Sequence, residues 1–219
     1  MIIDAQSLPD GSSIEADFCV IGGGMVALAL VRELASSGAS IVILESGGEA
    51  LVRATQDLYI GTGTLQGPVG PAIDISDYLH QSRVRYFGGS GNVWGGKCGV
   101  LERVDFDRRA WMPNSGWPFG RDVLDPYYDR ACDLLEIPHL TQDMEQLASA
   151  QRPVLRVGDG KTLTTEARHH TQFTGARGTR YNELKRAVTE PPNVKVYLNA
   201  NVTSLNLTST GDHLSDLTV

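Results

Sequence analysis

The sequence predicts an α/β fold with a parallel sheet, and three observations support this. An apolar run at residues 17–21 leads through a glycine turn to a helical stretch at about 25–37. A second apolar run at 41–45 follows and ends in an acid. Short apolar runs on either side of a helix are typical of a βαβ unit, whose parallel strands are buried on both faces. Strand-like alternation returns at 194–198 and 201–207, so the sheet is expected to gain strands from both ends of the chain.

The turn after the first predicted strand has small residues at three spaced positions. Gly22, Gly24 and Ala27 fill the pattern G-x-G-x-x-G/A. The first glycine permits a tight turn, the second lets the backbone approach a pyrophosphate, and the third small residue lets the helix pack on the strand. The helix begins near Met25, so its free N–H groups face the same place. The pattern predicts a Rossmann-like site for an adenine dinucleotide, against the alternative of a purely structural βαβ turn.

The second predicted strand ends at Glu45, 23 residues after Gly22. A carboxylate at this strand tip can accept hydrogen bonds from ribose hydroxyls, and its charge repels a 2′-phosphate. Gly38 follows the predicted helix at a position where helices often end in the left-handed conformation. Strand, turn, helix, strand and acid therefore occur in the order that dinucleotide binding requires, which favours the functional interpretation.

Composition excludes several other classes of function. The chain has 219 residues and a formal net charge of −7, which argues against nucleic acid or an anionic membrane as the main partner. No apolar run approaches the roughly 20 residues that span a bilayer. The N-terminal stretch lacks the basic start and apolar core of a signal peptide. Three separated cysteines (Cys19, Cys98 and Cys132) have no metal-site spacing, so we expect no metal and a cytoplasmic location.

Residues 46–81 are rich in Gly, Thr and Pro and predict a long surface excursion without packed elements. Pro126 marks the start of a helix that runs to about Glu136, and Pro138 terminates it. Residues 139–176 are polar and weakly patterned, whereas a helix is expected at 181–188. The last residues resemble the start of a strand, so we expect the chain to stop in mid-fold.

A second glycine cluster lies at residues 88–96, where GGSGNVWGG has five glycines in nine residues. One interpretation is an irregular loop that tolerates positive φ. The other is a loop whose backbone must approach a flat ligand. In that case Gly88 and Gly89 give amide donors to phosphate, and Gly95 and Gly96 leave room for a ring system.

The segments GGGMVA, LESGG, GGSGNVWGG and SGWPFGRDVLDPYYDRA together resemble the glucose–methanol–choline (GMC) oxidoreductases, nearest the sugar-oxidising branch around pyranose 2-oxidase. The resemblance is specific over about residues 15–137, looser over 180–207, and absent between 139 and 176. It implies FAD rather than NAD as the cofactor. It also implies an FAD-binding domain at 1–110 that resumes, incomplete, at 191–219. Residues 111–190 then form a connector and the beginning of an α+β substrate domain.

The resemblance assigns cofactor contacts residue by residue. The first cluster and the strand tip take the pyrophosphate and ribose, the second cluster passes the phosphates and reaches the isoalloxazine, and one later backbone pairs with adenine. Several relatives attach FAD to a histidine in the flavin-facing stretch, but Val93 stands there, which implies non-covalent FAD. The implied contacts are Gly22, Gly24, Met25, Glu45, Ser46, Arg85, Gly88, Gly89, Ser90, Asn92, Val93, Trp94, Gly95, Gly96 and Val202.

No catalytic residue is assigned. In the family that the chain resembles, an alcohol loses a proton to a histidine while its hydride passes to flavin N5, and that histidine lies in the C-terminal half. Nothing in this chain matches that half. His169 and His170 are neighbours that would point to opposite faces of a strand and are expected at the surface. His80 and His139 have no partner motif, and His213 lies near the end of the chain.

Two functions remain open. The chain is either the N-terminal portion or subunit of an FAD-dependent oxidoreductase, or a non-catalytic FAD- or dinucleotide-binding module that acts with a partner chain. The oxidoreductase would oxidise a CH–OH group of a sugar or polyol and need a C-terminal half or partner polypeptide.

Two residue groups outside the glycine clusters also need an interpretation. The aromatic residues Trp111, Trp117, Tyr127 and Tyr128 are either a sugar-stacking platform or a packed connector. The acids at 105, 107, 122 and 125 alternate with arginines and are interpreted as solvated ion pairs rather than a metal site.

Overall fold

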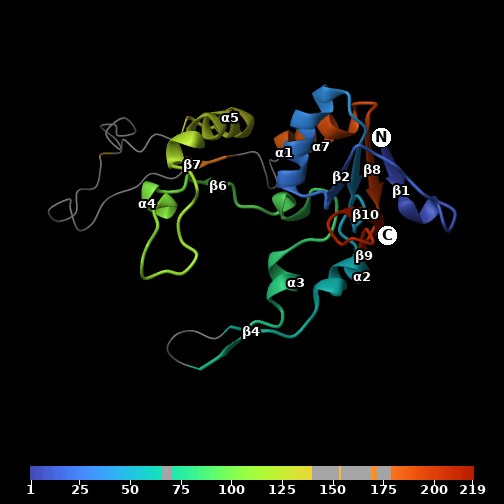
Figure 1. The fold of residues 1–219 in the computed structure, drawn as a ribbon, viewed down its shortest axis with the longest axis horizontal. Helices are drawn as coiled ribbons and strands as arrows, with labels where there is room; N and C mark the ends of the chain where they lie inside the picture. Colours follow the sequence, from blue (N-terminus) through green and yellow to red (C-terminus); the bar gives the residue numbers. More distant parts are fainter. Residues whose placement is uncertain (66–70, 140–152, 154–168, 172–178) are drawn as a thin grey trace. The chain divides into compact units, whose positions relative to one another are not determined.

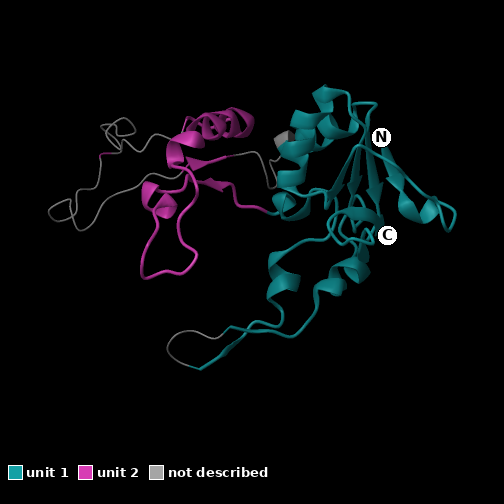
Figure 2. Ribbon diagram, in the orientation of Figure 1, with its two compact units in different colours: residues 1–93, 178–219 teal, residues 94–177 magenta. Residues whose placement is uncertain are grey.

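The structure is a computed structural model that describes residues 1–65, 71–139, 153, 169–171 and 179–219 (Figure 1). The chain divides into two compact units (Figure 2). The first comprises Met1–Val93 and Gly178–Val219, and the second comprises Trp94–Arg177. The domain limits at 110 and 190 concern cofactor and substrate domains, and they stay a prediction.

A four-stranded parallel sheet forms the centre of the first unit, in the order β1-β8-β3-β2. The strands are β1 Ile2–Asp4, β2 Phe18–Ile21, β3 Ile41–Leu44 and β8 Val194–Leu198. β3 pairs with β2 on one side and with β8 on the other, with Ile43 opposite both Val20 and Val196. All four residues of β3 are buried, as expected for an interior parallel strand. The predicted α/β fold with a parallel sheet is confirmed.

Two helices pack beside this sheet. α1 spans Met25–Leu34 between β2 and β3, and α7 spans Thr179–Thr189 just before β8. They lie side by side (Figure 1) and contact each other. Each buries an apolar stripe, which consists of Leu28 and Val31 on α1 and of Tyr181, Leu184 and Val188 on α7. Burial of these stripes is the main force that holds the helices in place.

The predicted strands and helices of the first unit lie where the sequence places them. α1 ends earlier than residue 37, because Ala35–Ser37 form a 3₁₀ turn, and Gly38 then takes the left-handed conformation with φ of 77°. The alternation after β8 forms an antiparallel hairpin of β9 Ser204–Leu207 and β10 Leu214–Thr218. β1 was not predicted. It pairs with β8, and the terminal ammonium of Met1 beside it donates to the carbonyls of Thr189 in α7 and Val194 in β8.

The prediction of an excursion without packed elements at 46–81 was wrong in part. This stretch contains α2 Arg53–Gln56, a 3₁₀ turn Asp57–Tyr59, the strand pair β4 Thr64–Leu65 and β5 Ile73–Asp74, and α3 Tyr78–Ser82. The reason is the buried amide of Gln56. Its Nε2 donates to the carbonyls of His80 and Arg83, and its Oε1 accepts from the Arg85 N–H, so one side chain satisfies three backbone groups.

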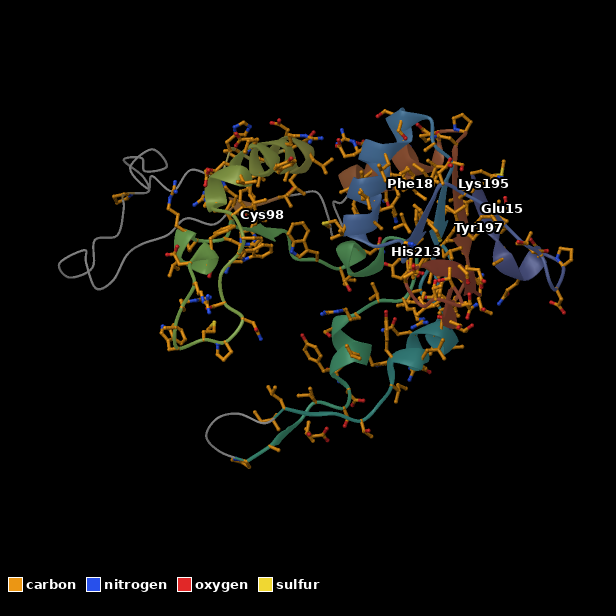
Figure 3. The ribbon with its side chains drawn as sticks, viewed as in Figure 1. Glu15, Phe18, Cys98, Lys195, Tyr197 and His213 are labelled. Atoms are coloured by element: carbon orange, nitrogen blue, oxygen red, sulfur yellow. The ribbon has the colours of Figure 1, made fainter. Side chains whose placement is uncertain are left out.

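The second unit contains β6 Lys97–Cys98, α4 Arg103–Phe106, α5 Asp125–Leu135 and β7 His169–His170. α5 begins with Pro126 in its first turn and ends at Glu136, whose φ is 52°. A core cluster of the second unit contains Cys98, Cys132 and Ile137 (Cys98 is labelled in Figure 3). Except for His169 and His170, the polar stretch at 139–176 lies almost wholly outside the described residues.

Candidate functional site

The first glycine turn leaves open space at the carboxyl end of β2. The Gly22 N–H donates to the Leu44 carbonyl at 2.7 Å, and Gly22 has a φ of 89° that favours glycine. Gly24 caps α1 in an extended conformation and has no side chain to cap the helix, and the first turn contains no acid. A Cβ at Gly22 or Gly24 would meet nothing within 4 Å. The first N–H groups of α1 therefore face a space that a phosphate can enter.

Gly23 is held more tightly than its two neighbours, a constraint that the sequence pattern does not reveal. A Cβ at this position would lie 2.8 Å from Cδ2 of Phe87 and 3.2 Å from Oε2 of Glu45. Phe87 is buried, and its N–H donates to the Gly48 carbonyl. Gly23 is therefore required by packing, whereas Gly24 faces the open space.

Glu45 follows β3 and ties the turn to the sheet. Its side chain is only 5% exposed. Oε2 accepts from the Gly23 N–H at 2.7 Å, and Oε1 accepts from the Gly47 N–H at 2.9 Å. The Ser46 hydroxyl lies 3.4 Å from Oε1. The carboxylate thus fixes the positions of two backbone turns at once, and these charge-assisted bonds stabilise its buried charge.

The second glycine loop joins the first directly. Its residues 88–92 include the 3₁₀ turn η4, Gly89–Asn92. The Gly88 N–H donates to the Gly23 carbonyl at 2.9 Å and the Gly89 N–H donates to the Tyr86 carbonyl at 2.7 Å, so the chain itself uses the two amides that were predicted as phosphate donors. Gly24 and Gly88 form an isolated parallel bridge. A Cβ on Gly89 would lie 3.2 Å from the Gly24 Cα. Glycine is needed here for close approach of two backbones, so the two clusters form one surface.

Asn92 and α7 hold the second loop in place. The Asn92 amide donates to the carbonyls of Phe87 and Gly89 at 3.1 and 2.9 Å. The Tyr181 hydroxyl donates to the Gly88 carbonyl, and the Lys185 ammonium donates to Asn92 Oδ1 at 3.2 Å. Burial raises the pKa of Tyr181, and the nearby Tyr86 and Glu45 add to this shift. Sequence analysis assigned no role to Tyr181 or Lys185.

Arg85 and Val202 lie near the ends of β3 and β8, as does Glu45. The Arg85 Nη2 donates to Asn201 Oδ1 at 2.6 Å, and the guanidinium lies 5.1 Å over the Tyr59 ring. The Arg85 Nε is buried and has no hydrogen-bond partner among the described residues. Val202 packs against a buried cluster that comprises Val42, Leu44, Tyr197 and Ala200.

The rest of the second cluster belongs to the other unit. Trp94 packs against the Cys98, Cys132 and Ile137 core. Gly96 has a φ of 80°, and a Cβ there would overlap the Thr171 carbonyl. The space beside Gly96 is therefore filled by Thr171. Gly95 has open space, and Val93, the last residue of the first unit, is 59% exposed. One continuous surface of the first unit contains Gly22, Gly24, Met25, Glu45, Ser46 and Gly88–Asn92.

His80 and His139 have no partner motif in the sequence, but each has an acidic partner in the structure. His80 Nε2 lies 3.0 Å from Asp57 Oδ1. His139 lies 3.1 Å from Asp133 and 3.4 Å from Asp129, and these bonds and charges raise its pKa. Their partners are 6 to 23 residues away in sequence, so no local motif marks them.

Neighbouring His169 and His170 differ in environment, as two sides of a strand should. His170 is exposed, whereas the Nε2 of His169 is buried and without a hydrogen-bond partner in the described part of the chain. The expectation that both lie at the surface therefore holds for His170, whereas His169 is partly buried.

The aromatic residues and acids of the second unit have mainly local contacts. Trp117 packs on Phe106 and Phe119 with centroid distances of 5.9 and 5.5 Å, whereas Trp111 is 74% exposed under Arg109. Arg121 is buried, and its pair with Asp125 at 3.2 Å is not fully solvated. The described residues contain no cluster that could hold a metal ion. They also contain no helix with the length and apolar character to cross a bilayer.

Comparison with known proteins adds support for the fold. No protein-family model matches the chain, and no curated protein matches its sequence. The solved structure of pyridoxine 4-oxidase from Mesorbium loti is similar, with a TM-score of 0.50 and 18% sequence identity. The fold is Rossmann-like α/β. The similarity covers 93% of this chain and 45% of that chain, so this chain spans less than half the length of its structural neighbour.

Proposed function

We propose that this chain binds FAD and forms the cofactor-binding portion of a GMC-type oxidoreductase that oxidises a CH–OH group of a sugar or polyol. The single observation that carries the proposal is the junction of the two glycine turns. Gly23 and Gly88 are hydrogen bonded, and Gly24 and Gly89 nearly touch, at the start of α1. A surface of backbone amides at a helix N-terminus is suited to a diphosphate.

The chain's residues fit such a cofactor. Open space beside Gly22 and Gly24 admits the diphosphate, and the first turn of α1 has no acid to repel it. A carboxylate has about four acceptor positions, so Glu45 can bind the Gly23 and Gly47 amides and still accept from ribose hydroxyls. Arg85 and Val202 would flank adenosine. Val93 has no nucleophile, so the proposal is non-covalent FAD.

FAD, when bound, supplies the acceptor for the hydride that leaves the alcohol carbon. The described residues bind and orient the cofactor, and no base is assigned among them. His80 is paired with Asp57, and His213 lies beside Asp212 with 79% of its side chain exposed. The proposal therefore includes a base from additional polypeptide, either a C-terminal continuation or a partner chain.

The edge of the sheet supports this additional polypeptide. β2 is the last strand of the parallel sheet, and its Phe18 and Ile21 are 44% and 54% exposed (Phe18 is labelled in Figure 3). Parallel strands are normally buried on both faces, and an apolar edge without charge or proline invites pairing. We propose that a further parallel strand packs against β2. A cytoplasmic location completes the proposal, because all three cysteines are free thiols.

The first experiment tests for bound flavin. Purified protein is expected to show flavin absorption, and acid precipitation should leave all flavin in the supernatant over a colourless pellet. A colourless protein that retains NAD would overturn the FAD assignment. Flavin fixed to a tryptic peptide from residues 85–97 would overturn the non-covalent attachment.

The second experiment tests for oxidation. The FAD-loaded chain is mixed without oxygen with sugars, polyols and pyridoxine, the last because the structural neighbour is named as an oxidase of it. No bleaching of the flavin is expected with residues 1–219 alone, since general-base help is worth roughly 10²–10⁴ in rate. Bleaching is expected when the additional polypeptide is present. If that assembly stays yellow with every alcohol, the alternative of a non-catalytic FAD-binding module is correct.

A further inference from the structure

The two joined glycine turns have no charge of their own. Residues 22–24 and 88–92 consist of glycine, serine and asparagine. The N-terminus of α1 contributes about half a positive charge. The diphosphate of a dinucleotide carries about two negative charges, so the glycine turns alone leave much of this charge uncompensated.

Lys185 of α7 is the cation bonded to the second turn. Its Nζ lies 3.2 Å from Asn92 Oδ1 and 5.6 Å from the centre of the Tyr181 ring. Among the described residues, Asn92 is the only hydrogen-bond acceptor of this ammonium. Burial lowers the pKa of Lys185, and the carboxylate of Glu49 opposes this shift. Arg85, the cation that the sequence predicted beside the cofactor, is instead bonded to Asn201.

Tyr181 lies one turn of α7 before Lys185 and contacts the same glycine loop. Its side chain is 2% exposed, and its hydroxyl donates to the Gly88 carbonyl. A Cβ at Gly91 would overlap this hydroxyl, so the loop and the tyrosine are in close contact. Residues four apart lie on one face of a helix, which places Tyr181 and Lys185 together against residues 88–92.

We propose that Tyr181 and Lys185 are positioning residues for the dinucleotide's diphosphate. Tyr181 fixes the Gly88 carbonyl and so holds the second turn in place beside the first turn of α1. Lys185 holds Asn92, which in turn bonds the Phe87 and Gly89 carbonyls, and supplies positive charge beside the loop. This inference rests on the proposed dinucleotide site, and it adds a charged group from a helix 93 residues away in sequence.

The test compares ligands with and without a diphosphate. FAD, ADP and adenosine are titrated into the chain and its variants by calorimetry. Lys185→Met should bind ADP and FAD about 10- to 100-fold more weakly, with adenosine unchanged, because only the first two contain the diphosphate. Lys185→Arg should restore most of the affinity because it keeps the charge. The matched control is Lys195→Met, since Lys195 is an exposed lysine on β8 (Figure 3).

Tyr181→Phe is the second variant and removes only the hydroxyl. It should bind ADP about 3- to 10-fold more weakly while its adenosine affinity is kept. Unchanged ADP affinity in both variants would overturn the inference, as would an equal loss of ADP and adenosine affinity. If the unmodified chain binds neither FAD nor ADP, the proposed function itself fails, so the two failures are distinguishable.

Discussion

Replacement of Glu45 by alanine should destabilise the first unit as well as weaken cofactor binding. The carboxylate is buried and accepts the Gly23 and Gly47 N–H groups at 2.7 and 2.9 Å. Each buried donor left without a partner costs about 1–3 kcal/mol. Glu45→Ala should therefore lower the free energy of unfolding by about 2–6 kcal/mol, a large part of the 5–15 kcal/mol typical of a domain. Glu45→Gln keeps one acceptor oxygen and should lose about half as much.

The assay is urea unfolding without nucleotide, followed by far-ultraviolet circular dichroism. Glu15→Ala is the matched control, because Glu15 is exposed, and it should change stability by less than about 0.5 kcal/mol. FAD affinity is then measured where the variant remains folded, and it should fall about 10- to 100-fold from the lost ribose bonds. If Glu45→Ala matches the control in urea, the carboxylate does not hold the two turns. If its FAD affinity is unchanged, Glu45 does not contact the ribose.

Three further predictions concern the turn, a histidine and the sheet edge. Gly24→Val should abolish FAD binding and leave the unfolding midpoint nearly unchanged, because a side chain there fills open space. Gly23→Ala should instead lower the free energy of unfolding by about 1–3 kcal/mol, because its methyl group clashes with Phe87. Equal stability of the two variants would contradict this. Because Asp133 and Asp129 raise the pKa of His139, the stabilisation relative to His139→Gln should be full below the unfolded pKa of about 6.5 and should disappear as pH rises through the higher folded pKa. Thermal midpoints of the two proteins that differ by a constant across this pH range would refute it. A thiol reagent should label exposed Cys19 quickly and the two buried cysteines slowly, and Cys19 should become protected when the additional polypeptide binds β2; undiminished labelling in that assembly would exclude this edge.

The sequence was sufficient to predict the βαβ unit because its information is local. Gly22, Gly24 and Glu45 occur within one short segment whose apolar pattern defines two strands and a helix. Chain geometry then brings the glycine turn and the strand tip to the same edge of the sheet. β1 was missed because three residues are too few for a periodic pattern, and its place depends on pairing with β8, more than 190 residues away.

The contacts that organise the site were beyond sequence reasoning for a related reason. Gln56 satisfies three backbone groups between residues 80 and 85, yet an isolated glutamine in a polar stretch has no distinguishing pattern. Tyr181 and Lys185 were interpreted only as helix residues, since their partners Gly88 and Asn92 are 93 residues away. Burial of the polar ends of these side chains is a tertiary property, and helical periodicity does not report it.

These long-range contacts also determine how much order nucleotide binding must create. Glu45 joins the first turn to the sheet, Gly23 and Gly88 join the turns to each other, and Tyr181 and Lys185 join the second turn to α7. Each bond is made by the chain's own groups, so the two glycine turns are ordered by folding rather than by a ligand. A preorganised site avoids the entropic cost of ordering a loop on binding. Glycine is flexible in isolation, but in these turns it permits the close approach of two backbones. Bonds to Glu45 and α7 then restrict the motion of the turns, so the glycines are compatible with tight binding.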